Sequence, residues 1–249
     1  MNDAPLFAAI RAGDQAMVDR LLAANPGAAM ASDAAGLSAL TVAAYHRQWP
    51  IVERILATGP DLDQFEAAIV GDVEWLRTLL DEADAEHGVE LETRRGPLEA
   101  PGPLAGRDAD DDATEPVDRR SADGFTALHL AAFFGRPEAA RLLLDRGADP
   151  NRWATGEQSV QPLHSAVAGG NEAVAALLVE RGANVNSTQS LGFTPLMGAA
   201  QNGMPSTVEL LLARGADPKA YNDDILTAAE LADRAGHPEV AATIRAAGG

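Results

Sequence analysis

The chain has 249 residues, with 37 Asp and Glu against 19 Lys and Arg and a formal net charge of −18. So large an excess of acidic side chains argues against nucleic acid or an anionic membrane surface as a partner. The absence of Cys excludes a disulfide framework, thiol catalysis and cysteine-ligated zinc.

Composition and hydropathy also suggest where the protein works. No apolar run approaches 18 residues, and no basic region followed by an apolar stretch opens the chain, so we expect a cytoplasmic protein without a membrane span. The single lysine, Lys219, stands against eighteen arginines, and Ala and Gly are abundant. This bias is typical of a GC-rich bacterial genome.

The first part of the chain contains three similar units, expected at residues 2–32, 33–60 and 61–85. Each has a starting tetrapeptide, a turn residue and a later apolar pair. In the second unit Arg47 stands where a turn glycine is expected, which makes that turn uncertain. The third unit is so short that we expect it to have lost the turn segment before its first helix. The tetrapeptides are Ala4–Phe7, Ser38–Thr41 and Phe65–Ala68.

Residues 86–119 interrupt the units with a different composition. Prolines and glycines alternate, Asp110-Asp111-Asp112 lies near the end, and acidic residues dominate. Such a segment buries too little apolar area to offset its ordering entropy, so we expect a flexible acidic insertion. Loose binding of a divalent cation by its acidic run stays open, with a solvated charge run as the alternative.

Four clearer units follow, expected at residues 121–152, 153–187, 188–220 and 221–249. Their tetrapeptides start at Thr126, Gln161, Thr194 and Thr227, at spacings of 35, 33 and 33 residues, and a glycine lies nine residues after each start. A constant period near 33 indicates modules that bury their apolar faces only by stacking. Thr can cap a helix, Pro fits its first turn, and Gly ends it, which predicts two antiparallel helices per unit.

These units resemble the ankyrin repeat family. Thr-Pro-Leu-His is matched by Thr126–His129 and by Thr194–Met197, and Gly-Ala-Asp-x-Asn by Gly147–Asn151. The resemblance implies one all-α domain, an ankyrin-repeat α-solenoid of about seven helix-turn-helix units with short β-hairpin-like fingers. It also implies a structural role for His129 and His164, as hydrogen-bond partners of the capping side chain and nearby backbone.

In that family partners bind the concave side, through the finger tips and first helices. The resemblance therefore implies a partner-binding set at the corresponding positions of this chain. Two alternatives stay open: the phenylalanines before Thr could pack between fingers, and one of an adjacent Phe pair could face the next unit, being about 100° apart on a helix. Trp49 and Trp75 are expected in the core. The set comprises Tyr45, His46, Phe125, Phe133, Phe134, Trp153, Phe193, Gln201 and Asn202.

Functionally, these features predict a monomeric, non-enzymatic adaptor that binds another protein. The histidines lack metal-ligand spacing, and no glycine-rich phosphate loop occurs, so we expect no metal and no cofactor. An alternative is an inhibitor or immunity-type protein that neutralises a basic toxin or nuclease through its acidic surface. An enzyme is the least favoured of the three classes.

Overall fold

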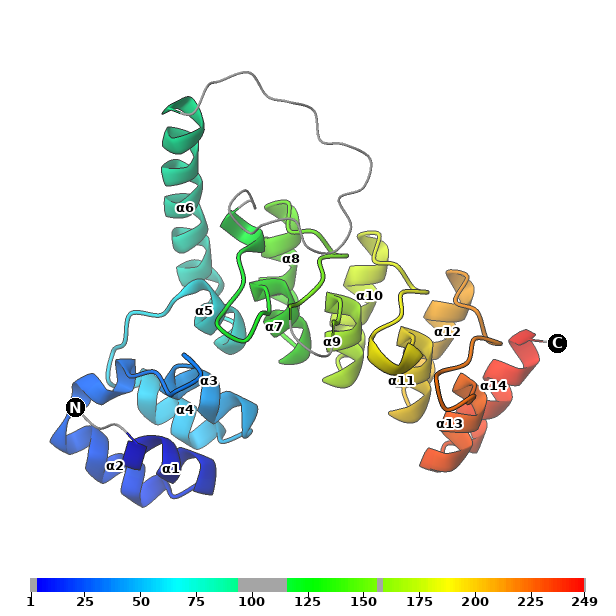
Figure 1. Ribbon diagram of the computed structural model, residues 1–249, viewed down its shortest axis with the longest axis horizontal. Coiled ribbons are helices and arrows are strands. Elements are labelled where there is room, and N and C mark those ends of the chain that lie inside the picture. Colours follow the sequence, from blue (N-terminus) through cyan, green and yellow to red (C-terminus); the bar gives the residue numbers. More distant parts are fainter. Residues whose placement is uncertain (1–3, 94–115, 156–158, 249) are drawn as a thin grey trace.

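The computed structural model describes residues 4–93, 116–155 and 159–248 (Figure 1). Within these ranges the chain forms fourteen α-helices in seven consecutive pairs. The first helices of the pairs are α1 (Ala4–Ala12), α3 (Ala39–Tyr45), α5 (Gln64–Val70), α7 (Ala127–Phe133), α9 (Pro162–Ala168), α11 (Pro195–Gln201) and α13 (Ala228–Ala235). The second helices are α2 (Gln15–Ala24), α4 (Trp49–Leu56), α6 (Val73–Thr93), α8 (Pro137–Asp145), α10 (Glu172–Glu180), α12 (Pro205–Ala213) and α14 (Pro238–Gly248).

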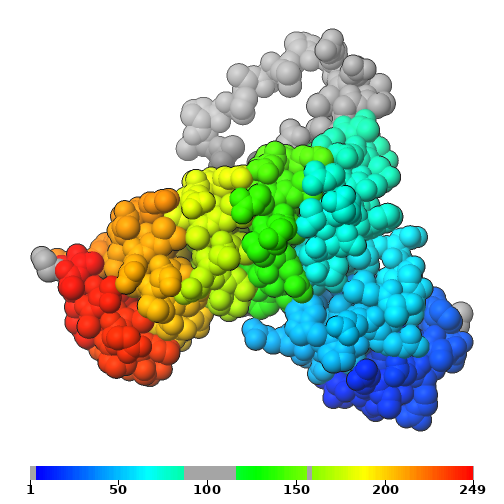
Figure 2. Space-filling view, turned by 180° about the vertical axis from the view of Figure 1, so that it is seen from behind, coloured from blue at the N-terminus to red at the C-terminus, as the bar shows by residue number. Residues whose placement is uncertain are grey.

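Short 3-10 helices occur at η1 (Pro26–Met30), η3 (Pro116–Asp118) and η4 (Ser190–Gly192). Successive first helices pack on one another in one row, and most successive second helices pack in another. The two ends of the chain lie at opposite ends of the molecule (Figure 1). Seen from behind, both ends lie below the green middle, so that the stack is bent (Figure 2). The structure is thus the all-α solenoid that the repeats predict.

Each helix pair forms where the sequence supplies its boundary signals. The hydroxyl of Thr126 accepts a hydrogen bond from the backbone N–H of His129, and Thr194 and Thr227 cap α11 and α13 in the same way. Between the helices of a pair the backbone takes a left-handed turn, with φ of 65° at Gly135. Arg47 makes the same turn at φ 55°, so the second unit keeps its geometry without the glycine.

Small residues on the first helices let neighbouring units approach closely. In α7, Ala127, Ala131 and Ala132 are fully buried, and Leu128 between them has no exposed surface. Alanine brings helix axes together, while the leucine fills the space between the two rows and contributes about 2 kcal/mol on burial. The buried leucine and the alanine three residues after it recur as Leu163 and Ala166 in α9 and as Leu196 and Ala199 in α11.

Hydrogen bonds between units fix the orientation of one unit relative to the next. Nε2 of His129 lies 3.1 Å from the carbonyl oxygen of Val160, and Nε2 of His164 lies 3.2 Å from that of Ser187. Since a carbonyl only accepts, Nε2 carries the proton in each ring, and Nδ1 accepts from the backbone N–H of Thr126 or Gln161. The structural role expected for both histidines is what the geometry shows.

A second set of inter-unit bonds follows the loops after the second helices. The amide of Asn151 donates to the carbonyl of Gly182 at 3.0 Å and accepts from the N–H of Asn184 at 2.7 Å. Asn186 repeats both bonds one unit later, to Gly215 and Asp217. Both edges of units four and five are therefore tied to the next unit.

The fingers are narrow turns closed by isolated bridges or single hydrogen bonds. Bridges join Ser32 to Ser38, Arg120 to Thr126 and Tyr221 to Thr227. We call these segments the finger of unit two, of unit four and of unit seven. The finger of unit six, residues 189–193, is closed by a hydrogen bond from the N–H of Gln189 to the carbonyl of Phe193.

Unit three differs from the others. Residues 57–63, which precede α5, have no bridge among the described part of the chain, in keeping with the expected loss of a finger. Around this unit the apolar side chains divide into two clusters, one of units one to three and one of units three to seven. Helix α7 contributes to both, through Leu130 to the first and Leu128 to the second.

The bounds predicted for the insertion, residues 86–119, are wrong at both ends. Helix α6 continues to Thr93, because Glu, Ala and Leu dominate its last turns and the single Gly88 weakens a helix by only about 1 kcal/mol. At the other end η3 is buried, and the carboxylate of Asp118 accepts a hydrogen bond from the N–H of Asp149 at 3.2 Å. Burial raises the pKa of Asp118. The acidic run Asp110–Asp112 lies outside the described residues.

The buried histidines should make stability depend on pH. Burial lowers the pKa of His129 from 6.5 to about 4, so that between these values the unfolded chain holds a proton that the folded chain does not. Stability is then complete above pH 6.5 and decreases as the pH falls towards 4. From about pH 7.5 to about pH 5 we expect the wild type to lose about 2 kcal/mol more than His129→Gln, measured by urea unfolding. Equal losses in the two proteins would contradict this assignment.

The aromatic contacts of Phe134 predict a role in stability. Its ring lies 5.7 Å from that of Tyr45 and 5.9 Å from that of Trp49, and it joins unit four to unit two. We expect Phe134→Ser to lower the free energy of unfolding by about 2 kcal/mol, because a half-buried ring loses these contacts. Phe133→Ser is the matched control and should cost less in the same urea titration. A larger loss for Phe133→Ser would overturn this distinction.

Candidate protein-binding groove

An apolar cavity of about 290 Å³ lies where α3, α7 and α9 meet the finger of unit four. Tyr45, Phe125 and Phe133 bring three aromatic rings to it, and two buried histidines lie beneath. The finger places Phe125 directly before the capping Thr126, so that its ring leans towards His129 at 5.8 Å. The cavity is lined by Tyr45, Phe125, His129, Leu130, Phe133, Val160, His164, Ser165, Ala168 and Gln189.

A second cavity, of about 470 Å³, adjoins the first along the row of first helices. The two share His164, Ala168 and Gln189, and together they run from unit two to unit six. We call this continuous surface the groove. The second cavity is lined by His164, Val167, Ala168, Gln189, Ser190, Leu191, Phe193, Thr194, Pro195, Gly198, Gln201 and Asn202.

The groove has no ionised floor near neutral pH. Burial lowers the pKa of both His129 and His164 to about 4, so the rings are neutral and their nitrogens are occupied by backbone partners. At one wall the hydroxyl of Tyr45 donates to the carboxylate of Asp123 at 2.5 Å. Burial and this carboxylate raise the pKa of Tyr45. The floor is suited to contact with apolar and neutral polar groups.

The structure divides the residues predicted from the sequence. Tyr45, Phe125 and Phe133 line the first cavity, whereas Phe193, Gln201 and Asn202 line the second. The amide of Asn202 also donates to the carbonyl of Val167 at 2.9 Å, which joins two units.

Three predicted residues lie elsewhere. Phe134 packs against Trp49 between units, so it is the ring of the pair that faces a neighbouring unit. His46 is exposed, and Trp153 is half-buried with its carbonyl accepting from Arg120 at 3.1 Å. Neither lines the cavities of the groove. Trp49 and Trp75, expected in the core, are only partly covered, and Trp75 is 38% exposed.

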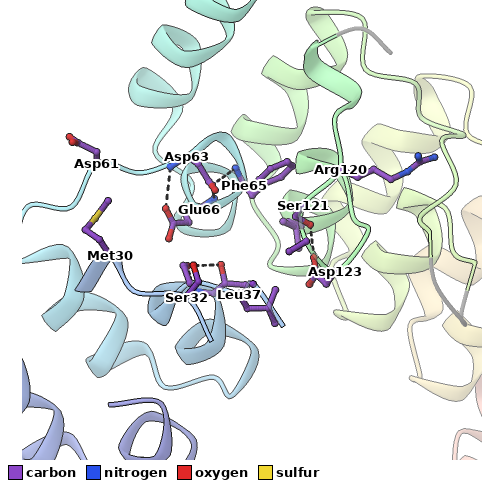
Figure 3. A pocket seen from close by; sticks show the side chains of 15 residues that line it. Met30, Ser32, Leu37, Asp61, Asp63, Phe65, Glu66, Arg120, Ser121 and Asp123 are labelled. Atoms are coloured by element: carbon purple, nitrogen blue, oxygen red, sulfur yellow. Dashed lines mark hydrogen bonds between the residues drawn. The ribbon is translucent and has the colours of Figure 1, made fainter. Parts of the chain in front are cut away.

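A separate cavity of about 320 Å³ lies where unit three lacks its finger (Figure 3). The fingers of units two and four form its walls, with Ser32 and Leu37 on one side and Ser121 and Asp123 on the other (Figure 3). Asp63 and Glu66 close it at the start of α5. Burial raises the pKa of Glu66, whose carboxylate accepts from the N–H of Asp63 at 3.1 Å. Four carboxylates line this cavity, those of Asp61, Asp63, Glu66 and Asp123, against the single guanidinium of Arg120, so it is acidic, unlike the groove.

Sequence reasoning missed three exposed apolar side chains on the last two fingers. Leu191 is 68% exposed, Tyr221 68% and Ile225 76%. The signal was available: the fingers of units two, four and six place glycine two residues before the capping Ser or Thr, whereas unit seven places Ile225 there.

Within residues 4–93, 116–155 and 159–248, no group of three or more His, Asp or Glu lies close enough to hold a metal ion. None of the described helices is both long and apolar enough to cross a membrane.

Comparison with known proteins agrees with the geometry. Family models for the ankyrin repeat match residues 123–154 and, as three copies, residues 154–222. The human neurogenic locus notch homolog protein 4 is 42% identical over 95 residues, which are 38% of this chain and 5% of that protein. The bovine ankyrin repeat and SOCS box protein 3 is 40% identical over 108 residues, 43% of this chain and 20% of that protein.

The chain therefore spans only a small part of the length of these relatives. The matched residues are those of units four to six, where the tetrapeptides and glycines are clearest. The matches thus show ankyrin repeats over residues 123–222, and the helix pairs on either side continue the same arrangement; ankyrin repeats are modules for protein–protein interaction.

Proposed function

We propose that the protein is an adaptor that binds a segment of another protein along the groove. The observation that carries this proposal is the continuity of two cavities from Tyr45 to Asn202, built from side chains of α3, α7, α9 and α11 and of the fingers beside them. A surface assembled from a row of equivalent helices offers similar contacts at each step. An elongated partner segment can use them together, whereas a small molecule uses only one.

The composition of the groove suggests what that segment carries. The aromatic wall formed by Tyr45, Phe125 and Phe133 suits a bulky apolar side chain, since such rings are frequent anchors of protein interfaces. Further along, Gln189, Gln201 and Thr194 offer neutral hydrogen-bonding groups. We therefore propose an apolar anchor residue followed by polar contacts, without a reaction step. The absence of enzymatic activity stays a prediction.

A second candidate function is neutralisation of a basic protein. The net charge of −18 and the carboxylates of Asp63, Glu66 and Asp123 around the acidic cavity favour a positively charged partner. In this case the association rate should fall steeply with added salt. An adaptor held mainly by the apolar groove should show an association rate that changes little.

The groove can be tested with peptides selected on the full chain from a random-sequence phage-display library. We expect Phe133→Ser to weaken binding of the selected peptides by about 2 kcal/mol or more, measured by fluorescence anisotropy, because it removes one wall of the anchor site. The matched control is Met17→Ser on α2, which removes an apolar side chain of 36% exposure on an outer helix. It should leave binding unchanged.

Two results would contradict the proposal. One is a library that yields no binder to the folded chain. The other is a set of binders whose affinity responds equally to Phe133→Ser and to Met17→Ser, because that would place the contact outside the groove.

A further inference from the structure

Two neighbouring finger tips hold bulky apolar residues in a backbone conformation that such residues rarely adopt. Leu191 has φ 63° and Ile225 has φ 60°, both in the left-handed region. There the side chain of an L-residue crowds the adjacent carbonyl, and the strain is greatest for a β-branched residue such as Ile.

The position of Ile225 in its finger shows that glycine would serve the turn better. The equivalent positions in units two, four and six are Gly36, Gly124 and Gly192, with φ between 73° and 86°. In unit seven the turn is held by Asn222, whose carbonyl and side-chain oxygens accept from the N–H groups of Ile225, Asp224 and Leu226. None of these bonds needs the isoleucine side chain.

Packing within the protein does not explain the residue either. Ile225 is 76% exposed and Leu191 68% exposed, and neither belongs to the two apolar clusters of the described chain. The free protein thus bears both backbone strain and exposed apolar surface at the same place. Strain of this kind, when it persists, concentrates at sites that bind or react.

The two tips are joined to each other and to the groove. The N–H of Asp223 donates to the carbonyl of Leu191 at 3.0 Å, which fixes the finger of unit seven against that of unit six. Leu191 also lines the second cavity of the groove. The tips therefore continue the groove beyond Asn202. On the same finger Asp223 and Asp224 are exposed beside Ile225.

We propose that the partner segment bound in the groove extends over the tips of units six and seven. There a second bulky apolar side chain packs on Leu191 and Ile225, and an adjacent lysine or arginine pairs with Asp223 and Asp224. This inference rests on the proposed function and adds the chemistry of the partner. A second copy of this chain is a poor occupant, because each copy carries a net charge of −18 and would bring further carboxylates to the same place.

The test separates strain from recognition in one substitution. Ile225→Gly should raise the melting temperature by about 1–3 °C, because relief of strain exceeds the added freedom of the unfolded chain. The same change should weaken binding of the peptides selected on the full chain at least tenfold, since it removes the apolar contact. The double variant Asp223→Asn, Asp224→Asn should also weaken peptide binding and should make the affinity less dependent on salt.

The matched control is Arg47→Gly. Arg47 has φ 55° and is exposed, so this variant also relieves left-handed strain, but it lies in unit two, away from the tips. Its melting temperature should rise by a similar amount while peptide affinity stays unchanged. A gain in stability coupled to a loss of affinity is then specific to Ile225→Gly.

The experiments distinguish failure of the proposed groove from failure of its proposed extension over the tips. If Phe133→Ser abolishes peptide binding and Ile225→Gly leaves it unchanged, the groove stands and the extension over the tips is wrong. If neither variant weakens binding, both proposals are wrong. A fall in melting temperature for Ile225→Gly overturns the argument from strain. A dimer in sedimentation equilibrium that Ile225→Gly dissociates would identify a second copy as the occupant and overturn the proposed partner.

Discussion

The structure depends on hydrogen bonds and close helix packing that cross from each unit to the next. A single pair of short helices cannot bury its own apolar face, so every unit completes the core of its neighbour. His129 and His164 add direction, since each ring joins the cap of its own first helix to the backbone that enters the next unit. Both rings are buried and neutral, and both of their nitrogens have backbone partners, so their role is structural. They lie beneath the groove, where they shape its floor without supplying charge.

The same stacking explains why the groove is continuous along the first helices, whereas the row of fingers is interrupted. First helices of equal length bring equivalent positions into line, and the cavities of the groove adjoin as a result. The fingers follow this order only where each unit has one. Because unit three lacks a finger, its neighbours enclose an acidic cavity, and Trp49 of unit two reaches unit four, where the guanidinium of Arg136 lies 5.0 Å from its ring. The shortened unit thus adds an acidic cavity to the molecule, chemically different from the groove.

Most of the fold could be predicted from the sequence, because the period and its boundary residues carry physical information. Thr126 caps the first helix of its unit and Gly135 makes the left-handed turn after that helix, as their places in the repeat predict. The extent of α6 could not be predicted from composition, since Gly and acidic residues suit a loop and a solvated helix alike. Nor could the choice between Phe133 and Phe134: they differ by one position, and only the place of Trp49 decides which ring is covered. The strain at Ile225 was visible as a departure from the finger pattern, but its meaning required the exposed surface beside it.

Helices α5 and α7 each belong to both apolar clusters, which has a consequence for how the protein opens. Fraying that starts at α1 removes the first cluster one unit at a time, and fraying that starts at α14 does the same to the second. Each process ends at these two helices, because Ile69 and Leu130 belong to the first cluster and Ala68 and Leu128 to the second. The backbone amides of α5 and α7 are thereby protected by the free energies of both halves and should exchange with solvent deuterium more slowly than those of either end. These two helices in the middle of the stack hold together two segments that can loosen separately.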